Sequence, residues 1–445
     1  MRRKAADFPR HLLLPSAFPA YAPRSFFCHE VKHVSRRDGS RARVGRLHTP
    51  HGIVDTPGFV VVGTNGAVKF VDHHAADTAG MQLMFANTLH LATHPGAETI
   101  AKAGGLHKLM GRRDRPLITD SGGFQIFSFA NRGENALPGR GEQDATPLED
   151  PSDGDDEGGE AEERVAGSEA ELKNAHLGAA RRRKYTEEAL ATSVRLSEAG
   201  ATFRSYRDGS PIFLSPESSV AVQKAIGADI ILPLDDLPSA GVDGAALAKS
   251  VARTHRWEAR SLAAHLADQR EQAMYCVVHG STSRELRAQS VATLSALPFD
   301  GYAIGGSFGR DRDEMVEMLR WLMPLIPTDK PNHLLGMGDA ESIAAGVSLG
   351  IDTFDSSWPT RLGRHGTLLT SEGKVKVGQA RYRDDYGPVD PRCDGFVSQN
   401  FSRAYLHHLW RANEPVVHGL LTLHNVKHMM DLMAELREKI WRDEI

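Results

Sequence analysis

The stretch PLITDSGGFQIF, residues 116–127, gives the strongest indication of fold and function in this chain. Apolar Leu117 and Ile118 run directly into Asp120, Ser121 and a pair of glycines. This order is typical of a buried strand that ends at a functional edge. Paired glycines at such an edge let a substrate approach the backbone closely. The stretch therefore predicts a strand whose carboxyl end carries chemistry.

Further short apolar stretches alternate with amphipathic helical patterns along the chain. Together with the first, the predicted strands cover residues 59–62, 82–87, 117–120, 229–234, 274–279, 302–305, 333–336 and 352–355. One predicted helix begins at Ser215, an N-cap followed by proline, and ends at Gly227. Other predicted helices cover residues 243–268, 282–294, 311–325 and 339–348. Eight strands spaced by helices predict an α/β fold, a (β/α)8 TIM barrel, with a doubly wound open sheet as the main alternative.

Chemistry-bearing residues recur at the carboxyl ends of the predicted strands. They are Asp120, Asp235, His279, Gly305, Gly306 and Asp355. In a (β/α)8 barrel the active site is built from this end of the strands. An open sheet would not gather chemistry from so many strands, so the pattern favours the barrel and predicts an active site at its C-terminal rim.

The composition is that of an ordinary globular enzyme, with 40% hydrophobic and 25% charged residues among 445. No apolar run is long enough to span a bilayer. The three cysteines, Cys28, Cys276 and Cys393, are too few and too far apart for a disulfide framework, which favours a reducing compartment.

The formal net charge of −4 hides an uneven distribution. Residues 141–172 hold thirteen Asp and Glu against one Arg, which leaves 52 basic and 44 acidic residues elsewhere. Part of this surplus lies in residues 1–27, and the remaining body is mildly basic. Such a body is compatible with a polyanionic partner.

Two segments are expected to lie outside the folded core. Residues 1–27, rich in arginine and proline, predict a basic disordered tail, with an organellar transit peptide as the alternative. Residues 131–184 form a Gly-, Pro- and acid-rich insert that predicts a disordered loop within a catalytic barrel of residues 28–384. The expected compartment is the cytoplasm, or a mitochondrion or plastid if the leader is a transit peptide.

Several motifs together resemble the tRNA-guanine transglycosylase (queuine tRNA-ribosyltransferase) family. They are TDSGGF at 119–124, ILPLDDLP at 231–238, YCVVHG at 275–280, YAIGGSFGR at 302–310 and GIDTFDSSWPTR at 350–361. The resemblance covers residues 45–130 and 200–440. It implies exchange of guanine in the tRNA anticodon wobble position for a 7-deazaguanine, without an organic cofactor.

Two carboxylates are candidates for the chemistry itself. A carboxylate at a strand end can attack an anomeric carbon, whereas its plainer role would be to cap the next loop. The resemblance assigns the nucleophile to Asp355. A second carboxylate can take and return a proton, and the resemblance assigns this role to Asp120. Two displacements at one carbon would keep the β configuration of the ribose.

A further group of residues is expected to bind the base. A carboxylate can accept both the N1–H and the exocyclic amine of guanine, and the resemblance places this role on Asp235, with Asp236 as an alternative N-cap of the next helix. By resemblance Ser121 helps to hold the base and Phe124 stacks on it, although core packing is an equal interpretation of Phe124. His279 stands where the family has a glutamine that reads the purine carbonyl.

The remaining base-binding residues lie in the motif at 302–310. The resemblance implies that the backbone of Gly305 and Gly306 contacts the base, although paired glycines are common in such turns. Gly309 and Leu237 resemble the eukaryotic branch of the family, which indicates a pocket for queuine. Ser307 replaces the family's usual leucine.

The loop after the last predicted strand is expected to contact tRNA. By resemblance Arg361 and Arg364 grip the anticodon, since a guanidinium suits phosphates and base edges. Ion pairs with an acidic rim are the simpler alternative. The family also works as homodimers or heterodimers, so a homologous second subunit is an expected partner.

Residues 385–445 resemble the family's zinc subdomain with an incomplete ligand set. Cys393 and His424 match ligand positions, but the other two positions are Gly395 and Ser398. Glycine has no ligand atom, and a serine hydroxyl is a poor zinc ligand beside a thiolate. The sequence therefore predicts a zinc-free subdomain.

Two other functions remain open at this point. A non-catalytic partner subunit of a transglycosylase heterodimer would explain the lost zinc ligands and His279, but it has no need of three retained aspartates. An unrelated barrel hydrolase would act on free nucleosides and would not require tRNA.

Overall fold

The computed structural model describes residues 10–123, 194–205, 207–238 and 242–445. Eight parallel strands close into a barrel in the order β10-β11-β12-β13-β14-β4-β5-β6. Their bounds are β4 Gly58–Val62, β5 Met84–Ala86, β6 Leu117–Thr119, β10 Ile230–Ile231, β11 Ala273–Val278, β12 Gly301–Ile304, β13 Asn332–Leu334 and β14 Thr353–Ser356. The predicted (β/α)8 barrel is confirmed, and the open sheet is excluded.

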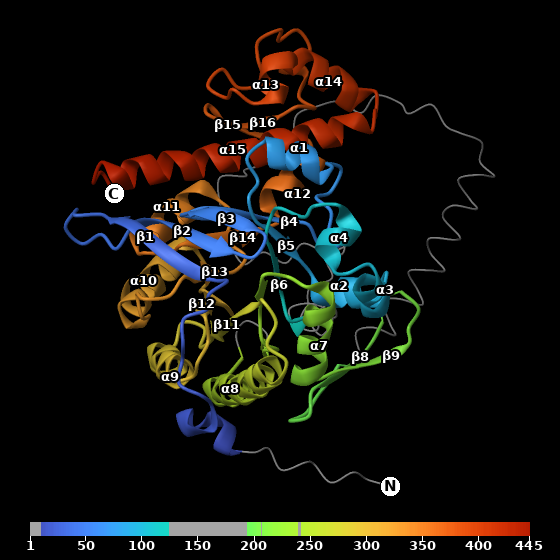
Figure 1. Ribbon diagram of the computed structural model, residues 1–445. Coiled ribbons are helices and arrows are strands. Elements are labelled where there is room, and N and C mark those ends of the chain that lie inside the picture. Colours follow the sequence, from blue (N-terminus) through green and yellow to red (C-terminus); the bar gives the residue numbers. More distant parts are fainter. Residues whose placement is uncertain (1–9, 124–193, 206, 239–241) are drawn as a thin grey trace.

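Helices surround the barrel strands (Figure 1). They are α1 His73–Thr78, α2 Thr88–Thr93, α3 Ala97–Lys102, α4 Leu106–Met110, α7 Pro216–Ile226, α8 Gly244–Ala267, α9 Arg284–Ser295, α10 Arg312–Leu322, α11 Ala340–Ser348 and α12 Trp358–Arg364. The start of α7 shows why these sequences fold as predicted. The Ser215 side chain accepts from Ser218 N, proline occupies the first turn, and Gly227 ends the helix with a φ of +74°.

Alternating side chains of the strands build two layers of core. On β11, Tyr275 and Val277 belong to the cluster inside the barrel, whereas Cys276 and Val278 pack outward against the helices. All four are buried, which explains why the sequence shows a continuous apolar run there. The interior is filled with side chains, so ligands must approach from an end of the barrel.

A three-stranded antiparallel sheet, β1-β2-β3, lies beside the N-terminal ends of the barrel strands. Its strands are β1 Cys28–Val34, β2 Arg43–Thr49 and β3 Gly52–Thr56, and β3 leads directly into β4. The buried pair of Arg43 with Asp352, 2.6 Å between Nη2 and Oδ2, ties β2 to the start of β14.

Residues 10–27 differ from the disordered tail predicted over residues 1–27. They form the short 3-10 helices η1 Arg10–Leu13 and η2 Pro15–Ala17. Leu12 and Leu13 pack against the main core, and Phe27 is only 3% exposed. Arg24 Nε also lies 2.8 Å from Asp300 Oδ1. The prolines break regular structure, as expected, but the apolar side chains and Arg24 still find partners on the barrel.

The C-terminal part forms a separate layer on one side of the barrel (Figure 1). It contains the hairpin β15 Thr367–Thr370 and β16 Gly373–Lys376, followed by α13 Phe396–Asn400 and α14 Arg403–Arg411. The long helix α15 Val416–Trp441 runs between this layer and the barrel, and it packs against α12 and β15. The layer has its own core, which includes Leu368, Val397 and Leu406.

The remaining elements are short. The strands β7 Arg195–Leu196, β8 Ala201–Arg204 and β9 Pro211–Leu214 form a small antiparallel sheet, and η3 Met323–Leu325 and η4 Ala380–Tyr382 are 3-10 turns. Within the described ranges, no helix combines the length and hydropathy needed to cross a membrane. The predicted acidic insert at 131–184 and Phe124 lie outside the described residues.

Candidate active site

The three aspartates singled out in the sequence lie at the carboxyl ends of barrel strands. Asp120 follows β6, Asp235 lies in the loop after β10, and Asp355 is near the end of β14. Each side chain is largely buried, with exposed fractions of 7% to 8%. Because the barrel strands are parallel, all three carboxylates belong to the same rim.

Asp355 is oriented by donors from β13 and the turn after it. His333 Nε2 donates to Asp355 Oδ1 over 3.1 Å, and Gly336 N donates to the same oxygen over 3.0 Å. The other ring nitrogen of His333 lies 2.9 Å from Thr353 Oγ1, which fixes the ring orientation. Since both donors hold Oδ1, the geometry makes Oδ2 the oxygen suited to form a new bond.

Asp120 is held by the loop after β5. Asn87 Nδ2 donates to Asp120 Oδ2 over 2.8 Å, and Thr88 N donates to Oδ1 over 2.6 Å. The Thr88 hydroxyl donates to the Asp120 carbonyl over 2.5 Å. These bonds fix the direction of the carboxyl group, as a proton-transferring group requires.

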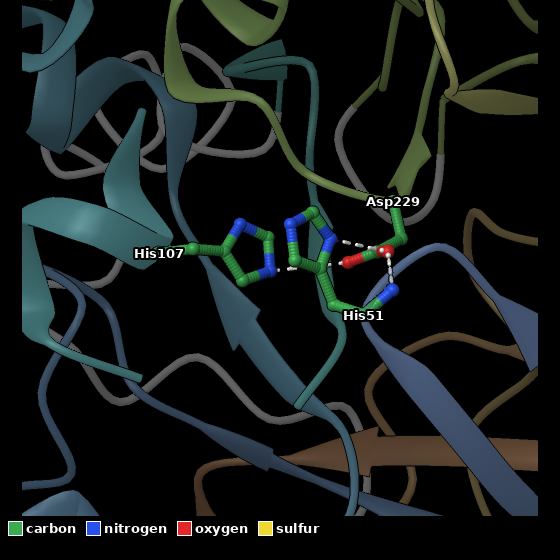
Figure 2. A group of neighbouring side chains, drawn as sticks. All are labelled: His51, His107 and Asp229. Atoms are coloured by element: carbon green, nitrogen blue, oxygen red, sulfur yellow. Dashed lines mark hydrogen bonds and ion pairs between the residues drawn. The ribbon is translucent and has the colours of Figure 1, made fainter. Parts of the chain in front are cut away.

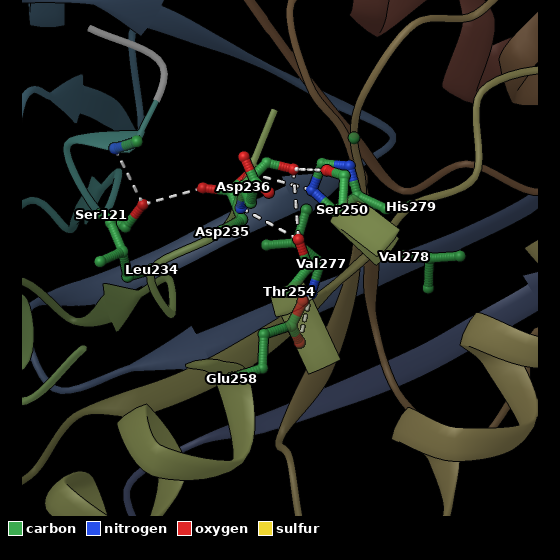
Figure 3. Close-up of polar contacts among 12 residues, drawn as sticks. Ser121, Leu234, Asp235, Asp236, Ser250, Thr254, Glu258, Val277, Val278 and His279 are labelled. Atoms are coloured by element: carbon green, nitrogen blue, oxygen red, sulfur yellow. Dashed lines mark hydrogen bonds and ion pairs between the residues drawn. The ribbon is translucent and has the colours of Figure 1, made fainter. Parts of the chain in front are cut away.

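Asp235 joins Ser121 and His279 in one hydrogen-bonded group (Figure 3). Ser121 Oγ donates to Asp235 Oδ1 over 3.1 Å, and His279 Nε2 donates to Oδ2 over 2.9 Å. A Cβ on Gly123 would lie 2.4 Å from Asp235 Oδ1, so only glycine fits beside this carboxylate. The group therefore brings three of the predicted base-binding residues together, and His279 is hydrogen-bonded to Asp235.

The neighbouring Asp236 has a different role from the alternative considered for it. The N-cap of α8 is Asp243, not Asp236. Asp236 Oδ2 lies 2.8 Å from Arg253 Nη1, and its carbonyl accepts from the Ser250 hydroxyl. Asp236 thus anchors the loop to α8, and Asp235 is the carboxylate that faces Ser121 and His279.

A buried acid on α8 lies behind this loop. Glu258 Oε2 accepts from Val277 N on β11 over 3.1 Å, as Figure 3 shows. Burial raises the pKa of Glu258 well above its ordinary value. Among the described residues its Oε1 has no hydrogen-bond partner.

A fully buried guanidinium connects the two loops expected to contact the base. Arg287 on α9 donates to the carbonyls of Val278, Gly305 and Ser307 over 2.7 Å, 2.8 Å and 3.0 Å. A fourth bond, 2.8 Å long, goes to the Ser281 carbonyl. Burial lowers the pKa of Arg287 to about 9. Arg287 therefore clamps the end of β11, next to His279, to the glycine loop after β12.

The glycine loop continues the contacts around the rim. A Cβ on Gly306 would lie 3.0 Å from His279 Nδ1, so His279 packs directly against this backbone. A Cβ on Gly305 would lie 3.3 Å from Leu335, the residue before Gly336. Gly336 N in turn donates a hydrogen bond to the Asp355 carboxylate on β14. The rim from β6 to β14 is thus one connected set of groups.

The space around Gly309 is more crowded than the expected pocket for queuine requires. The φ of Gly309 is +113°, and a Cβ there would lie 2.6 Å from Glu314 Cβ and 3.5 Å from Thr282. The missing side chain therefore avoids a clash with Glu314 Cβ on α10 rather than leaving an empty space. Glycine at this position is needed for the backbone conformation itself.

The two arginines expected to contact tRNA lie on α12, directly after β14. Arg361 and Arg364 are both partly exposed near the end of the helix. Lys69 is close enough to Arg364 that burial and this neighbour lower the pKa of Lys69. Positive side chains are thus grouped beside the rim.

The residues at the zinc-like positions form hydrogen bonds with one another instead of a tetrahedral set. His424 Nε2 donates to the Leu369 carbonyl over 2.8 Å, and Ser398 Oγ lies 3.3 Å from His424 Nδ1. Burial lowers the pKa of His424 to about 4, so the ring is neutral. Cys393 Sγ accepts from Gly395 N over 3.4 Å.

A lysine fills the remaining space beside these positions. A Cβ on Gly395 would lie 2.8 Å from Lys427 Cγ. Lys427 Nζ lies 2.5 Å from Asp394 Oδ1 and 2.5 Å from Asp431 Oδ1. Burial acts to lower the pKa of Lys427, but the two carboxylates raise it overall. A permanent cation beside two remaining ligand atoms does not fit a zinc site.

Several groups of the site were not found in the sequence. Asn87, His333, Gly336 and Arg287 hold the predicted residues in place but were not singled out. Asn87 and Gly336 are the last residues of predicted strands, so the rule that selected Asp120 could also have selected them. Arg287 gave no such signal, because a polar residue in an amphipathic helix normally faces solvent.

Comparisons with known proteins agree with this arrangement. A family model described as Queuine tRNA-ribosyltransferase matches residues 38–157 and 182–445. A queuine tRNA-ribosyltransferase of Protochlamydia amoebophila is 45% identical over 422 residues, which cover 95% of this chain and 97% of the relative. Proteins of the same name from Chlamydia felis and Chlamydia trachomatis are 44% and 43% identical over 93% and 94% of this chain, and 98% and 99% of their own lengths.

Proposed function

This chain belongs to the queuine tRNA-ribosyltransferase family, and from this premise we propose that it exchanges guanine at the anticodon wobble position for queuine through a covalent aspartyl–ribose intermediate. It is thus a pentosyltransferase that acts on tRNA. The observation that carries the proposed mechanism is the orientation of Asp355, whose Oδ1 is held by two donors on the rim that also carries Asp120 and Asp235.

In the first displacement, Asp355 Oδ2 attacks the ribose C1′ of the target nucleotide. The C1′–N9 bond breaks, and N9 of the departing guanine takes a proton from the Asp120 carboxyl group. The electron pair of the broken bond leaves with the base, and a C1′–O bond holds the tRNA on the protein. The target base must first leave its stack, which a flexible anticodon loop permits.

In the second displacement the incoming base reverses these events. Its ring N–H gives a proton to Asp120 while that nitrogen attacks C1′, and the C1′–O bond breaks to release Asp355. No net proton is consumed and the sugar keeps its configuration. The energy of the glycosidic bond is stored in the ester-like bond to Asp355, so no nucleotide energy source or organic cofactor is required.

Base recognition centres on Asp235, which would accept the N1–H and the exocyclic amine of the base. Ser121 and His279 already donate to its two oxygens, so they would orient the carboxylate for both contacts. Phe124 would stack on the base, and the backbone of Gly305 and Gly306 would border it.

Queuine is the base that the relatives' printed names carry. The discriminating experiment offers guanine-34 tRNA with labelled queuine or with the aminomethyl-7-deazaguanine precursor. Queuine should be incorporated at lower concentration. Preference for the precursor would contradict this part of the proposal and would leave the exchange reaction itself intact.

Arg361 and Arg364 would bind the anticodon stem-loop next to the rim, with a homologous second subunit supporting the rest of the tRNA. The compartment proposed is the cytoplasm. Removal of residues 1–27 as a transit peptide would strip Leu12, Leu13 and Phe27 from the core, which argues against such cleavage.

The C-terminal layer is proposed to fold without zinc, because Lys427 and the Ser398–His424 bond occupy the ligand positions. The test is to measure zinc in purified wild type and in Cys393→Ser. Zinc that is lost specifically with Cys393 would contradict the proposal.

The proposed chemistry is tested by trapping the covalent adduct. Wild-type protein is mixed with guanine-34 tRNA and denatured without an acceptor base, and the adduct is detected as a protein band that carries labelled tRNA. Asp355→Asn should abolish the band, while Ser356→Ala, a matched neighbour on β14, should keep it. Wild type without adduct, but with tight tRNA binding, would favour the non-catalytic partner subunit.

A further inference from the structure

A second group of side chains lies at the opposite end of the barrel from the catalytic rim. His51 is in the turn between β2 and β3, His107 is on α4, and Asp229 immediately precedes β10 (Figure 2). Asp229 thus lies at the amino end of the strand whose carboxyl end leads to Asp235. The proposed transglycosylase mechanism uses none of these three residues.

The ligand atoms of the group are close together. His51 Nδ1 lies 2.9 Å from Asp229 Oδ1, and His107 Nε2 lies 3.2 Å from Oδ2. The three ligand atoms are all within 4.8 Å of one another. Within the described ranges this is the one set of three or more His, Cys, Asp or Glu side chains with such spacing. Two imidazoles and a carboxylate are a typical donor set for zinc and similar divalent ions.

The two imidazole rings and the carboxylate are held in a fixed arrangement. The rings of His51 and His107 are stacked with centroids 3.6 Å apart and an interplanar angle of 11°. The backbone N–H groups of His51 and Leu117 donate to Asp229 Oδ1 and Oδ2 over 3.1 Å and 2.8 Å, so the carboxylate is fixed in place between the two rings.

The ring nitrogen Nε2 of His107 is paired with Asp229 by charge but lacks a well-aligned hydrogen bond. His107 is only 4% exposed. Its Nε2 lies 3.2 Å from Asp229 Oδ2 but makes no hydrogen bond of good geometry among the described residues. The Asp229 oxygen therefore does not lie in a suitable hydrogen-bonding direction. A buried ring nitrogen of this kind is costly unless another group binds it.

A cavity of about 230 Å³ adjoins the two rings and opens to solvent. Besides His51 and His107, it is lined by Gly104, Gly105, Lys108, Arg113 and Gly227. Lys108 and Arg113 are exposed, so their charges can move away from an incoming cation or pair with an anionic ligand bound to it. The cavity gives an ion a route of entry and room for a further ligand.

We propose that His51, His107 and Asp229 bind one divalent transition-metal ion of the zinc class, with its open coordination position facing this cavity. His51 must tilt out of its stack so that both nitrogens reach the ion, and its place in a partly exposed hairpin turn allows this movement. The ion would connect the β2–β3 hairpin, α4 and β10. Its expected effect is on stability, because the site is remote from the catalytic rim.

The experiment uses tag-free full-length protein freed of metal with a chelator and then titrated with Zn²⁺ or Co²⁺ by equilibrium dialysis. Wild type should bind one equivalent, and its melting temperature should rise as the free ion increases. His51→Asn, which changes a partly exposed turn residue, should weaken binding more than about tenfold, as loss of one of three ligands predicts. His107→Asn should do the same.

Cys393→Ser is the matched control, since it removes the one thiol at the zinc-like positions of the C-terminal layer. This variant should keep the full equivalent, and bound Co²⁺ should lack a sulfur-to-cobalt charge-transfer band. No bound metal in wild type would overturn the proposal. So would binding that survives His51→Asn and is lost in Cys393→Ser. Neither outcome affects the proposed base exchange, which requires no metal.

Discussion

The rim at the carboxyl ends of the barrel strands and the C-terminal layer differ in how fully they keep the residues that the family resemblance assigns to them. At the rim, Asp120, Asp235 and Asp355 are all present, and each carboxylate is oriented by two donors. In the C-terminal layer, two of the four positions that the family resemblance assigns to zinc ligands are Gly395 and Ser398, and other contacts fill the space.

The difference follows from what each region must do. A reaction needs particular atoms at particular positions, because misplacing the nucleophile removes most of the rate of the reaction. A small folded layer only needs to remain closed, and hydrogen bonds, an ion pair and a core around Leu368 and Leu406 can replace a metal. Changes at the rim should therefore affect activity more than stability, and changes in the C-terminal layer should do the reverse.

The largest effect is expected from Asp355→Asn. The amide keeps the shape of the carboxylate but cannot form the covalent bond, so the rate of guanine exchange should fall by at least about 1,000-fold. The melting temperature should stay within a few degrees of wild type. The measurements are incorporation of radiolabelled guanine into guanine-34 tRNA and thermal unfolding. A variant that retained more than a tenth of the activity would show that Asp355 is not the nucleophile.

Arg287→Met should sharpen the comparison, since Arg287 stabilises the fold and also positions the base-binding loops. The change leaves four carbonyls without their donor, two of them buried and two partly buried, and we expect a loss of about 4 kcal/mol of stability. At a temperature where the variant is folded, KM for the base should rise more than kcat falls. Added guanidinium at low concentration should lower that KM again, whereas urea should not. Unchanged KM would mean that Arg287 is structural only.

The barrel could be predicted from the sequence because each of its strands is a short apolar run bounded by Gly, Pro or Asp. The run at 229–234 shows the limit of this method. Only Ile230–Ile231 pairs in the sheet, because Pro233 has no N–H to donate and the chain then enters a loop. The packing of residues 10–27 was missed, since three prolines interrupt the segment and its apolar residues show no periodicity.

At the candidate site, the sequence showed the residues that end strands but not those that hold them. Arg287 and Glu258 are polar positions within amphipathic helices, and nothing in their spacing distinguishes them from solvent-facing neighbours. Both are fully buried because they bind backbone atoms of β11 and the loops after it. Such contacts depend on which helix packs against which strand, so only the three-dimensional structure reveals them.

Lowering the pH should destabilise the C-terminal layer, because the unfolded chain binds a proton at His424 more readily than the folded chain does. The pKa of His424 is lowered from 6.5 to about 4, so between these pH values the unfolded chain binds a proton that the folded chain does not. The unfolded state therefore gains stability as pH falls, and unfolding of the layer should become about 3 kcal/mol easier from pH 7 to pH 4. Limited proteolysis across this range measures the effect. His424→Gln should be less stable at pH 7 but should lose this part of the pH dependence. An unchanged slope would contradict the role of His424.

The smallest effect is expected from Lys427→Met, which keeps the aliphatic packing beside Gly395 but removes the ammonium group. Lys427 is paired with Asp394 and Asp431, whose side chains are 80% and 45% exposed, so solvent screens both pairs. We expect a loss of about 1 kcal/mol measured by chemical denaturation, with guanine exchange unchanged. Lys439→Met, which breaks an exposed pair with Glu435 on the same helix, is the matched control and should cost less. If Lys427→Met were neutral, packing alone would hold the ligand positions closed; if it impaired exchange, the two regions would be coupled.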